Sequence, residues 1–477
     1  MPDPDTVVKP LALAATFPPV TSKAWDAAVR QDLKGADFDG RLVWHTDEGF
    51  SVSPYYRAND LVGLVDQLSS VPGSHPFVRG SGEPFALASE PLPADAIRAD
   101  LLHDAGANAV QEIGYSVAEG VDRIAAATER GVAVDAAAPS LQFVFAVGSI
   151  YFLEIAKLRA ARLVWARAVD AFEPADPAVG RMRQIVRTAR SNKSVYDPYT
   201  NLLRVTTEAM SAVIGGCDRL VVEPFGFDEH LAVNVARMLS EESHLDAVAD
   251  SAGGSYYVEM LTDMVGRAAW TLLQQVERAG GYAQAKASGS IDAALATARA
   301  SREQAVSSRK RTLVGVNNYP DTHAKDPVTV KLPSDSSADT TAWRMALPFE
   351  RVRERTSRWA RANGRYPLVL LLTRGDAKMR TARANFCLNL FGCAGFDVAQ
   401  ADDLEGRPDL VVLCSSDSEY LPLAHEVCQR TTVPVIVAGQ PKDQIEALRA
   451  AGVAGFVHAQ SDAVATLTEW QQRLGIV

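Results

Sequence analysis

Residues 191–227 have the sequence SNKSVYDPYTNLLRVTTEAMSAVIGGCDRLVVEPFGF, which contains a helix start, a helix, a helix end and a strand in unbroken succession. Asp197 can accept hydrogen bonds from the first free N–H groups of a helix, and Pro198 suits the first helical position because it has no N–H to lose. The glycine pair at 215–216 favours the left-handed backbone that ends helices. The stretch therefore predicts one helix followed by a buried strand over 220–222, a unit typical of parallel α/β folds.

A second helix is predicted over 151–169, where apolar residues recur on one side, and the alternation of helices and strands favours a (β/α) barrel or an open parallel sheet. Four segments resemble, in the same order, segments of the methylmalonyl-CoA mutase family: IYFLEIAKLRAARLVWARAV (150–169), NKSVYDPYTNLLRVTTEAMSAVIGG (192–216), DSAGGSYYVEMLT (250–262) and LVGVNNYP (313–320). Members of that family pair a (β/α)8 barrel, which holds acyl-CoA, with a C-terminal flavodoxin-like domain that holds cobalamin. The resemblance implies the same α/β architecture here.

The composition is that of an ordinary globular protein, with 47% hydrophobic and 22% charged residues, and 477 residues predict two or three domains. A net charge of −10 argues against nucleic acid as the main partner, because phosphate binding rests on clustered Lys and Arg. No apolar run reaches the roughly 18 residues of a membrane span, and the N-terminus lacks the basic lead of a secretory signal. We therefore expect a cytoplasmic protein with no membrane partner. Its five cysteines, without a CxxC pair, fit reduced and buried thiols.

The first 75 residues, 1–75, are expected to form an N-terminal arm. A helix is predicted over 22–35 with Thr21 or Ser22 as its cap, and a small hairpin or irregular strands over 41–61. The segment resembles the arm that wraps around the partner subunit in mutases, so it would lack a core of its own.

The barrel domain is expected to span 76–329 in a shortened form. The Pro-, Gly- and Ser-rich stretch 71–84 would lead into it, and its PFVRG resembles a family motif at the substrate entrance. A strand is predicted at 96–102, then a loop and a long helix over 103–131. About five strands can be counted in all, fewer than the roughly eight that close a barrel. Either the barrel is incomplete, with its edges covered by the arm or another chain, or the count misses strands.

A polar linker over 330–347 and a final domain over 348–477 complete the predicted organisation. The domain would open with a helix and contain five short apolar strands, at 367–373, 396–400, 409–415, 433–439 and 454–459. This number suits a flavodoxin-like doubly wound sheet, whose ligand lies at the carboxyl ends of the strands.

The residues that would hold cobalamin at that edge are missing. Cobalamin-binding members of the family carry a DxHxxG loop after the first strand, whose histidine becomes a cobalt ligand. No histidine lies between His323 and His425 here. Hydroxyl and guanidinium groups cannot replace imidazole on cobalt. The loop in this chain consists instead of Thr373, Arg374, Gly375 and Asp376.

Two later positions complete the vestigial cobalamin loop that we expect: Ser416 after the third strand, and Gly439, which survives from a glycine pair of the cofactor-binding chains. Arg374 and Asp376 either form an ion pair that plugs the empty cofactor mouth or are solvated surface charges. We expect neither a cofactor nor a metal in this chain.

The barrel also lacks a residue that the resemblance implies. In the catalytic chains a histidine shortly before the DPY segment contacts the substrate thioester, but residues 187–191 contain none. His103 matches a family position beside a strand end and is either structural, or vestigial, or in contact with a ligand. His458, at the end of the last strand, does not match the ligand loop. Packing at the helix start is expected to explain Tyr196 and Tyr199.

The resemblance implies a small, non-catalytic subunit of a heterodimeric adenosylcobalamin-dependent mutase, with no catalytic residues of its own. The large subunit would hold adenosylcobalamin and interconvert methylmalonyl-CoA and succinyl-CoA, and acyl-CoA would reach this chain only through that partner. Two alternatives stay open. The chain is itself a mutase that binds cobalamin with its own lower base retained, or it is a solitary accessory paralogue that binds acyl-CoA or a partner, a second copy of itself included.

Overall fold

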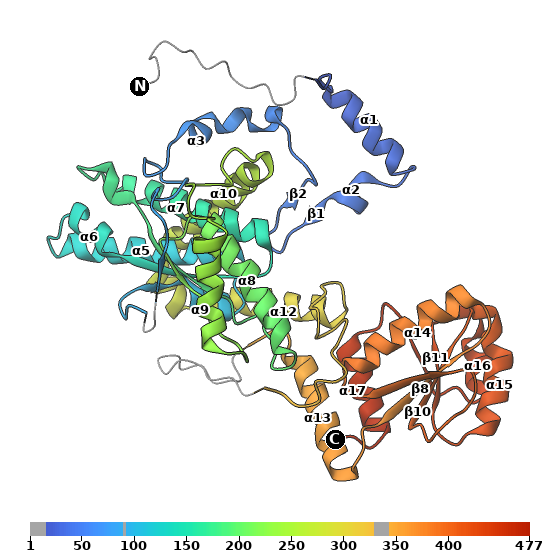
Figure 1. Cartoon of the computed structure of the whole chain (residues 1–477). Coiled ribbons are helices and arrows are strands. Elements are labelled where there is room, and N and C mark those ends of the chain that lie inside the picture. The colour runs from blue at the N-terminus through green and yellow to red at the C-terminus, as the bar shows by residue number, and fades with distance from the viewer. Residues whose placement is uncertain (1–15, 89–91, 329–342) are drawn as a thin grey trace. The chain divides into compact units, whose positions relative to one another are not determined.

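The computed structural model describes residues 16–88, 92–328 and 343–477. The chain divides into two compact units, Met1–Tyr56 and Arg57–Val477 (Figure 1). Most of the predicted linker at 330–347 lies outside the described residues.

The N-terminal unit contains two helices and a hairpin. Its elements are α1 (Ser22–Asp32), α2 (Phe38–Leu42), β1 (Trp44–His45) and β2 (Ser51–Val52), with β1 and β2 antiparallel. Thr21 caps α1 by accepting a hydrogen bond from Ala24 N at 3.2 Å, which confirms the predicted helix start. The Tyr55 ring contacts Trp25, with ring centroids 5.7 Å apart. Neither helix, both fully described, buries a residue, and Trp25 is 48% exposed, so this unit has little core.

The second unit begins with a five-stranded parallel sheet of order β3-β7-β6-β5-β4. Its strands are β3 (Ala86–Leu87), β4 (Ile97–Arg98), β5 (Gln142–Val147), β6 (Arg183–Thr188) and β7 (Arg219–Val221). Among the described residues, the end strand β3 pairs only with β7 and the end strand β4 only with β5, so the sheet is open. The strand predicted at 96–102 is wrong beyond Arg98, because Ala99–Asp104 forms helix α4, where Ala105 N bonds Leu101 O at 2.9 Å.

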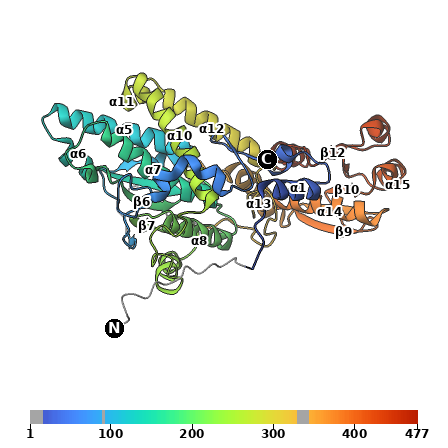
Figure 2. The same ribbon diagram turned by 90° about the horizontal axis from the view of Figure 1, so that it is seen from above.

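Helices surround this sheet. They are η1 (Ala58–Leu64), α3 (Val65–Ser69), α5 (Ala109–Glu129), α6 (Val134–Ser140), α7 (Tyr151–Asp170), η2 (Pro177–Gly180), α8 (Pro198–Ile214), α9 (Glu229–Arg237), η3 (Met238–Glu242), α10 (Tyr256–Arg278), α11 (Gly281–Ala287) and α12 (Ser290–Ser307). Figures 1 and 2 show α5, α7 and α10 side by side, and each contacts the other two. Helix α7 is therefore buried on nearly all sides, and the expectation of a one-sided apolar pattern is wrong for it.

Charged side chains on α7 are buried with partners. Lys157 lies 2.8 Å from Glu112 on α5 and pairs with Glu154 at 2.5 Å. Arg159 pairs with Glu259 on α10 at 2.7 Å. Because a buried charge without a partner costs several kcal/mol, these pairs fix how α7 sits between its neighbours.

Arg162 ties the loop before the sheet to the end of α8. Its guanidinium donates to the carbonyl oxygens of Phe77 and Val78 and to those of Gly215 and Gly216, at 2.7–3.1 Å. Burial lowers the pKa of Arg162 to about 10. The PFVRG segment, expected at a substrate entrance, is thus bound through its backbone to the chain's own arginine.

The unit around 191–227 forms as predicted. Asp197 accepts a hydrogen bond from Thr200 N at 3.2 Å, Pro198 opens α8, and the backbone turns left-handed at Gly216 (φ 77°). Strand β7 then pairs in parallel with β6. Asp197 itself has φ 58°, a conformation that Asp and Asn tolerate better than other residues with a side chain.

The C-terminal part of the chain, from Leu347 onward, contains the five predicted strands. Helix α13 (Leu347–Asn363) leads into β8 (Leu368–Thr373), α14 (Ala377–Gly392), β9 (Asp397–Ala401), β10 (Leu410–Cys414), η4 (Asp417–Glu419), α15 (Tyr420–Arg430), β11 (Val435–Ala438), η5 (Lys442–Gln444), α16 (Ile445–Ala450), β12 (Gly455–Val457) and α17 (Ala463–Arg473). The strands are parallel in the order β12-β11-β10-β8-β9, which confirms all five predicted strands.

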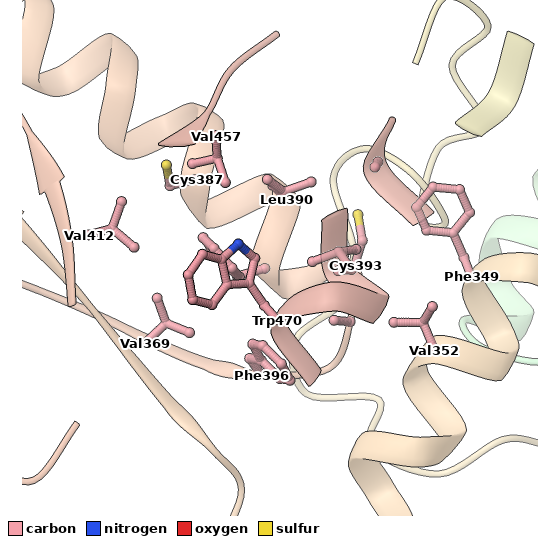
Figure 3. Close-up of a cluster of buried hydrophobic side chains, with 14 of the residues drawn as sticks. Phe349, Val352, Val369, Cys387, Leu390, Cys393, Phe396, Val412, Val457 and Trp470 are labelled. Carbon is pink, nitrogen blue, oxygen red and sulfur yellow. The ribbon is translucent and has the colours of Figure 1, made fainter. Parts of the chain in front are cut away.

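Hydrophobic layers cover both faces of this sheet. Residues of α13, α14 and α17 form one layer, in which Trp470 packs among Val369, Leu390 and Phe396 (Figure 3), and residues of α15 and α16 form the other. Four of the five free cysteines are buried and Cys428 is half-buried, as expected for reduced thiols. Across the described ranges, no helix combines the length and apolar character needed to span a membrane.

The cap of α8 offers a direct test of the fold assignment. We expect Asp197→Ala to lower the free energy of unfolding by about 2 kcal/mol, because it removes the cap and places a Cβ without a polar group in a left-handed position. Asp197→Asn keeps a side-chain oxygen and tolerates the same backbone conformation, so it should lower the free energy of unfolding by less than half as much. Urea denaturation followed by circular dichroism measures both, and equal losses in the two variants would contradict the assignment.

Candidate functional site

The carboxyl ends of β8, β10 and β11 meet at one edge of the C-terminal sheet. The first and third strands of the C-terminal sheet, β8 and β10, are neighbours, so the loops after them leave the sheet in different directions. In doubly wound sheets this is the place of the crevice that takes ligands, and we call it the β8–β10 crevice. The expected vestigial loop lies here. Thr373 ends β8 and donates to Ala401 O at 3.3 Å, and Ser416 follows β10.

Glu419, which is not among the residues predicted from the sequence, contacts both loops. Its Oε2 accepts hydrogen bonds from Ser415 Oγ at 2.7 Å, Ser416 Oγ at 2.5 Å, Ser416 N at 3.2 Å and Asp376 N at 3.2 Å. These bonds, the one from the Ser416 side chain first, lower the pKa of Glu419 to about 2. The spacing Ser416-x-x-Glu419 is that of a capping box, a local signal that could have drawn attention to it.

The two glycines of the expected loop face charged side chains of the chain itself. Gly375 has φ 77°, and a Cβ there would overlap the Glu419 carboxylate. A Cβ at Gly439 would lie 3.2 Å from the guanidinium carbon of Arg383. Arg383 in turn pairs with Asp417 at 3.3 Å. The space next to these two glycines is thus occupied by the side chains of Glu419 and Arg383.

The ion pair suggested between Arg374 and Asp376 is wrong. Arg374 pairs instead with Glu426 at 2.8 Å and Asp403 at 3.2 Å, in a partly exposed network. Asp376 caps α14 by accepting from Met379 N at 2.8 Å. The N-terminus of α14 attracts the Asp376 carboxylate because the first N–H groups of a helix have no partner within the helix. Asp376 therefore caps α14 and does not pair with Arg374.

These residues do not fit cobalamin. The β8 loop provides no imidazole, and the crevice beside it holds the Glu419 carboxylate. Within the described ranges, no three His, Cys, Asp or Glu side chains are grouped so as to hold a metal ion. His458 follows β12, and its Nδ1 accepts from Gln460 N at 3.3 Å in a local turn. Burial lowers the pKa of His458.

A second group of polar residues lies at the carboxyl edge of the other sheet. His103 on α4 is buried, with Nδ1 3.2 Å from Glu112 and Nε2 3.2 Å from Ser191 Oγ. The order hydroxyl, imidazole, carboxylate is that of an activated nucleophile. Here Lys157 neutralises the carboxylate, and Ser191 is 3% exposed. This arrangement favours a structural role for His103. Its contact with Ser191 joins two segments that are 88 residues apart, so sequence spacing could not predict it.

Paired arginines occupy 187–191, where catalytic chains would carry the substrate histidine. Burial alone would lower the pKa of Arg187, but Asp104, Glu223 and Asp100 together raise it well above its usual value. Arg190 donates to both carboxylate oxygens of Glu223, at 2.6 and 2.9 Å. Each guanidinium is therefore held by carboxylates of the same chain.

Of the two tyrosines around Asp197, Tyr196 is packed as expected. It is buried, and the Arg353 guanidinium lies 4.4 Å from its ring centroid. Burial raises the pKa of Tyr196 to about 12. Packing does not explain Tyr199, which is 74% exposed on the outer side of the first turn of α8, so that expectation is wrong.

Comparison with known proteins places this geometry in a family. The family model described as Methylmalonyl-CoA mutase matches residues 94–359. A methylmalonyl-CoA mutase small subunit of Porphyromonas gingivalis is 30% identical in an alignment of 616 positions, which covers 97% of this chain and 99% of the relative. One of Streptomyces virginiae is 34% identical, over 78% of this chain and 63% of its own length.

A relative named simply methylmalonyl-CoA mutase, from Cereibacter sphaeroides, is 39% identical but aligns with 46% of this chain and 32% of its own length. The Porphyromonas alignment runs over 616 positions against 477 residues here, so that relative contains segments without a counterpart in this chain. The chain therefore belongs to the methylmalonyl-CoA mutase family, and the similarity that covers most of its length is to small subunits of that family.

Proposed function

We propose that this chain is the non-catalytic small subunit of a heterodimeric adenosylcobalamin-dependent mutase. A large partner subunit holds adenosylcobalamin and acyl-CoA and interconverts methylmalonyl-CoA and succinyl-CoA, and this chain stabilises it. One observation carries the proposal: the β8 loop, where a cobalt-binding imidazole would lie, has no histidine, and its Asp376 N binds the chain's own Glu419. The names of the small-subunit relatives support the presence of a larger partner.

The architecture we propose follows the family in two parts. The strand order of the C-terminal part, with its second strand outside the first, supports a flavodoxin-like domain of the cobalamin-binding type over 348–477. The five parallel strands of the other sheet support a shortened (β/α) barrel within 76–329. On one face of that sheet, Leu92 and Ala96 pack with Val144, Ile185 and Val221. This packing supports an incomplete barrel whose face is covered by the chain itself.

The partner-binding arm, expected over 1–75, is proposed to be shorter. Residues 57–75 belong to the second unit, where Gln67 Nε2 donates to Glu259 at 2.6 Å. The first unit, up to Tyr56, exposes Phe17 (74%), Val20 (67%) and Trp25 (48%). A segment with so little core and so much exposed apolar surface suits burial against another protein. The reduced thiols and the composition fit a cytoplasmic location.

Co-expression with a histidine-bearing large mutase subunit tests the proposal. We expect a 1:1 complex with one bound cobalamin that converts methylmalonyl-CoA to succinyl-CoA. Arg374→Ala in this chain should leave turnover per cobalamin unchanged, because the β8 loop here takes no part in the reaction. Absorbance measures the bound cobalamin and a coupled assay measures the turnover of the two complexes. Conversion by this chain alone with adenosylcobalamin, or two cobalamins per complex, would contradict the proposal.

Removal of residues 1–56 tests the arm. We expect the Kd for the large subunit to rise at least about tenfold, because the arm supplies apolar contact area, while the melting temperature of the remaining unit stays unchanged. Trp25→Ala in the full chain is the matched single-residue variant and should raise the same Kd by a smaller factor. An unchanged Kd in the truncated chain, measured by interferometry, would rule out the arm as a partner contact.

A further inference from the structure

Four hydrogen-bond donors from two separate loops converge on a single atom in the β8–β10 crevice. The donors are Asp376 N after β8, and Ser415 Oγ, Ser416 N and Ser416 Oγ after β10, and the atom is Glu419 Oε2. Ser415 Oγ also lies 2.8 Å from Arg374 O in the β8 loop, and its single hydrogen is shared between this carbonyl and Glu419 Oε2. Three of the four donors belong to the same segment as Glu419, so the carboxylate orders the β10 loop and contacts the β8 loop through Asp376 N. The pair between Arg383 on α14 and Asp417 adds a further contact between the two sides.

A local helix cap does not account for this arrangement. The capping box explains the bonds between Ser416 and Glu419, which are three residues apart. It does not explain the bond from Asp376 N, because that residue precedes Glu419 by 43 positions and belongs to the other loop. It does not explain Gly375 either, where any side chain would overlap the carboxylate. In the β8 loop, the N–H of Asp376 and the missing side chain of Gly375 therefore accommodate a carboxylate from another loop.

The position of the carboxylate is that of a ligand. In doubly wound parallel sheets, ligands bind at the carboxyl ends of the strands where the strand order reverses, here between β8 and β10. Asp376 N belongs to the cap residue of α14, and backbone N–H groups at such places commonly bind anions. The low pKa of Glu419 keeps its side chain charged at neutral pH.

We propose that Glu419 is an intramolecular ligand, a carboxylate that occupies the crevice between β8 and β10 and keeps its two loops closed without a cofactor. The crevice is then an anion site in a self-occupied state. The inference goes beyond the proposed function, because it concerns what fills the crevice of this chain whether or not a partner subunit is bound.

The test uses the full-length chain and three variants. Glu419→Ala removes the carboxylate, Glu419→Gln keeps the shape without the charge, and Glu426→Ala, which removes a partner of Arg374 outside the crevice, is the matched control. Amide hydrogen exchange is measured over 374–379 and 415–419. We expect exchange in both segments to rise about tenfold in Glu419→Ala and less in Glu419→Gln, with no change over these segments in Glu426→Ala.

Chemical rescue completes the test. Formate or acetate, against chloride at equal ionic strength, should slow exchange in Glu419→Ala toward the wild-type rate and leave the wild type and the control unchanged, because the donors then bind the added carboxylate. Unchanged exchange in Glu419→Ala would overturn the proposal. So would a rise confined to 415–419 or a variant that formate and acetate do not protect, since either result indicates a local cap only. If Glu419→Ala does not fold, the exchange measurement rests on Glu419→Gln, in which unchanged exchange over 374–379 would overturn the proposal.

Discussion

Charges at the carboxyl ends of parallel strands have to find partners, and in this chain they find them within the chain itself. A buried charge costs several kcal/mol unless it is paired and hydrogen-bonded. Arg187 meets this requirement with Asp100, and Lys157 with Glu112. At the other sheet, Glu419 receives the donors of two loops. The edges at which a parallel α/β fold usually takes its ligands are thus occupied by the chain's own groups.

Under the proposed function, this constraint explains how a member of a catalytic family could keep its fold without keeping its chemistry. The two sheets and the helices on them depend on apolar packing, such as the layer around Trp470, and Gly375, Asp376 and Glu419 are not part of the buried clusters of the C-terminal sheet. Under the same proposal, the loops can carry residues that bind each other where a cofactor-binding member carries a metal ligand. Gly375 remains a glycine for a physical reason of its own, because the Glu419 carboxylate now lies where a Cβ would be.

Local patterns were sufficient to predict much of the fold. The cap, helix and strand of 191–227 and the five strands of the C-terminal part were predicted because each depends on neighbouring residues. Contacts between distant residues were not accessible in the same way. Helix α7 is buried on nearly all sides because α5, α8 and α10 pack against it, and residues 99–102 of the predicted strand belong to α4. The missing cobalt ligand was visible in the sequence, but Glu419 could not be connected with Asp376 across 43 residues.

The most direct test of the account is the binding of adenosylcobalamin to the isolated chain. Equilibrium dialysis followed by the absorbance spectrum of the protein fraction measures it. The account predicts no bound cofactor above background, because the β8 loop has no imidazole and the crevice is closed by Glu419. One equivalent of cobalamin bound by the isolated chain would contradict the account and show that the crevice still serves as a cofactor site.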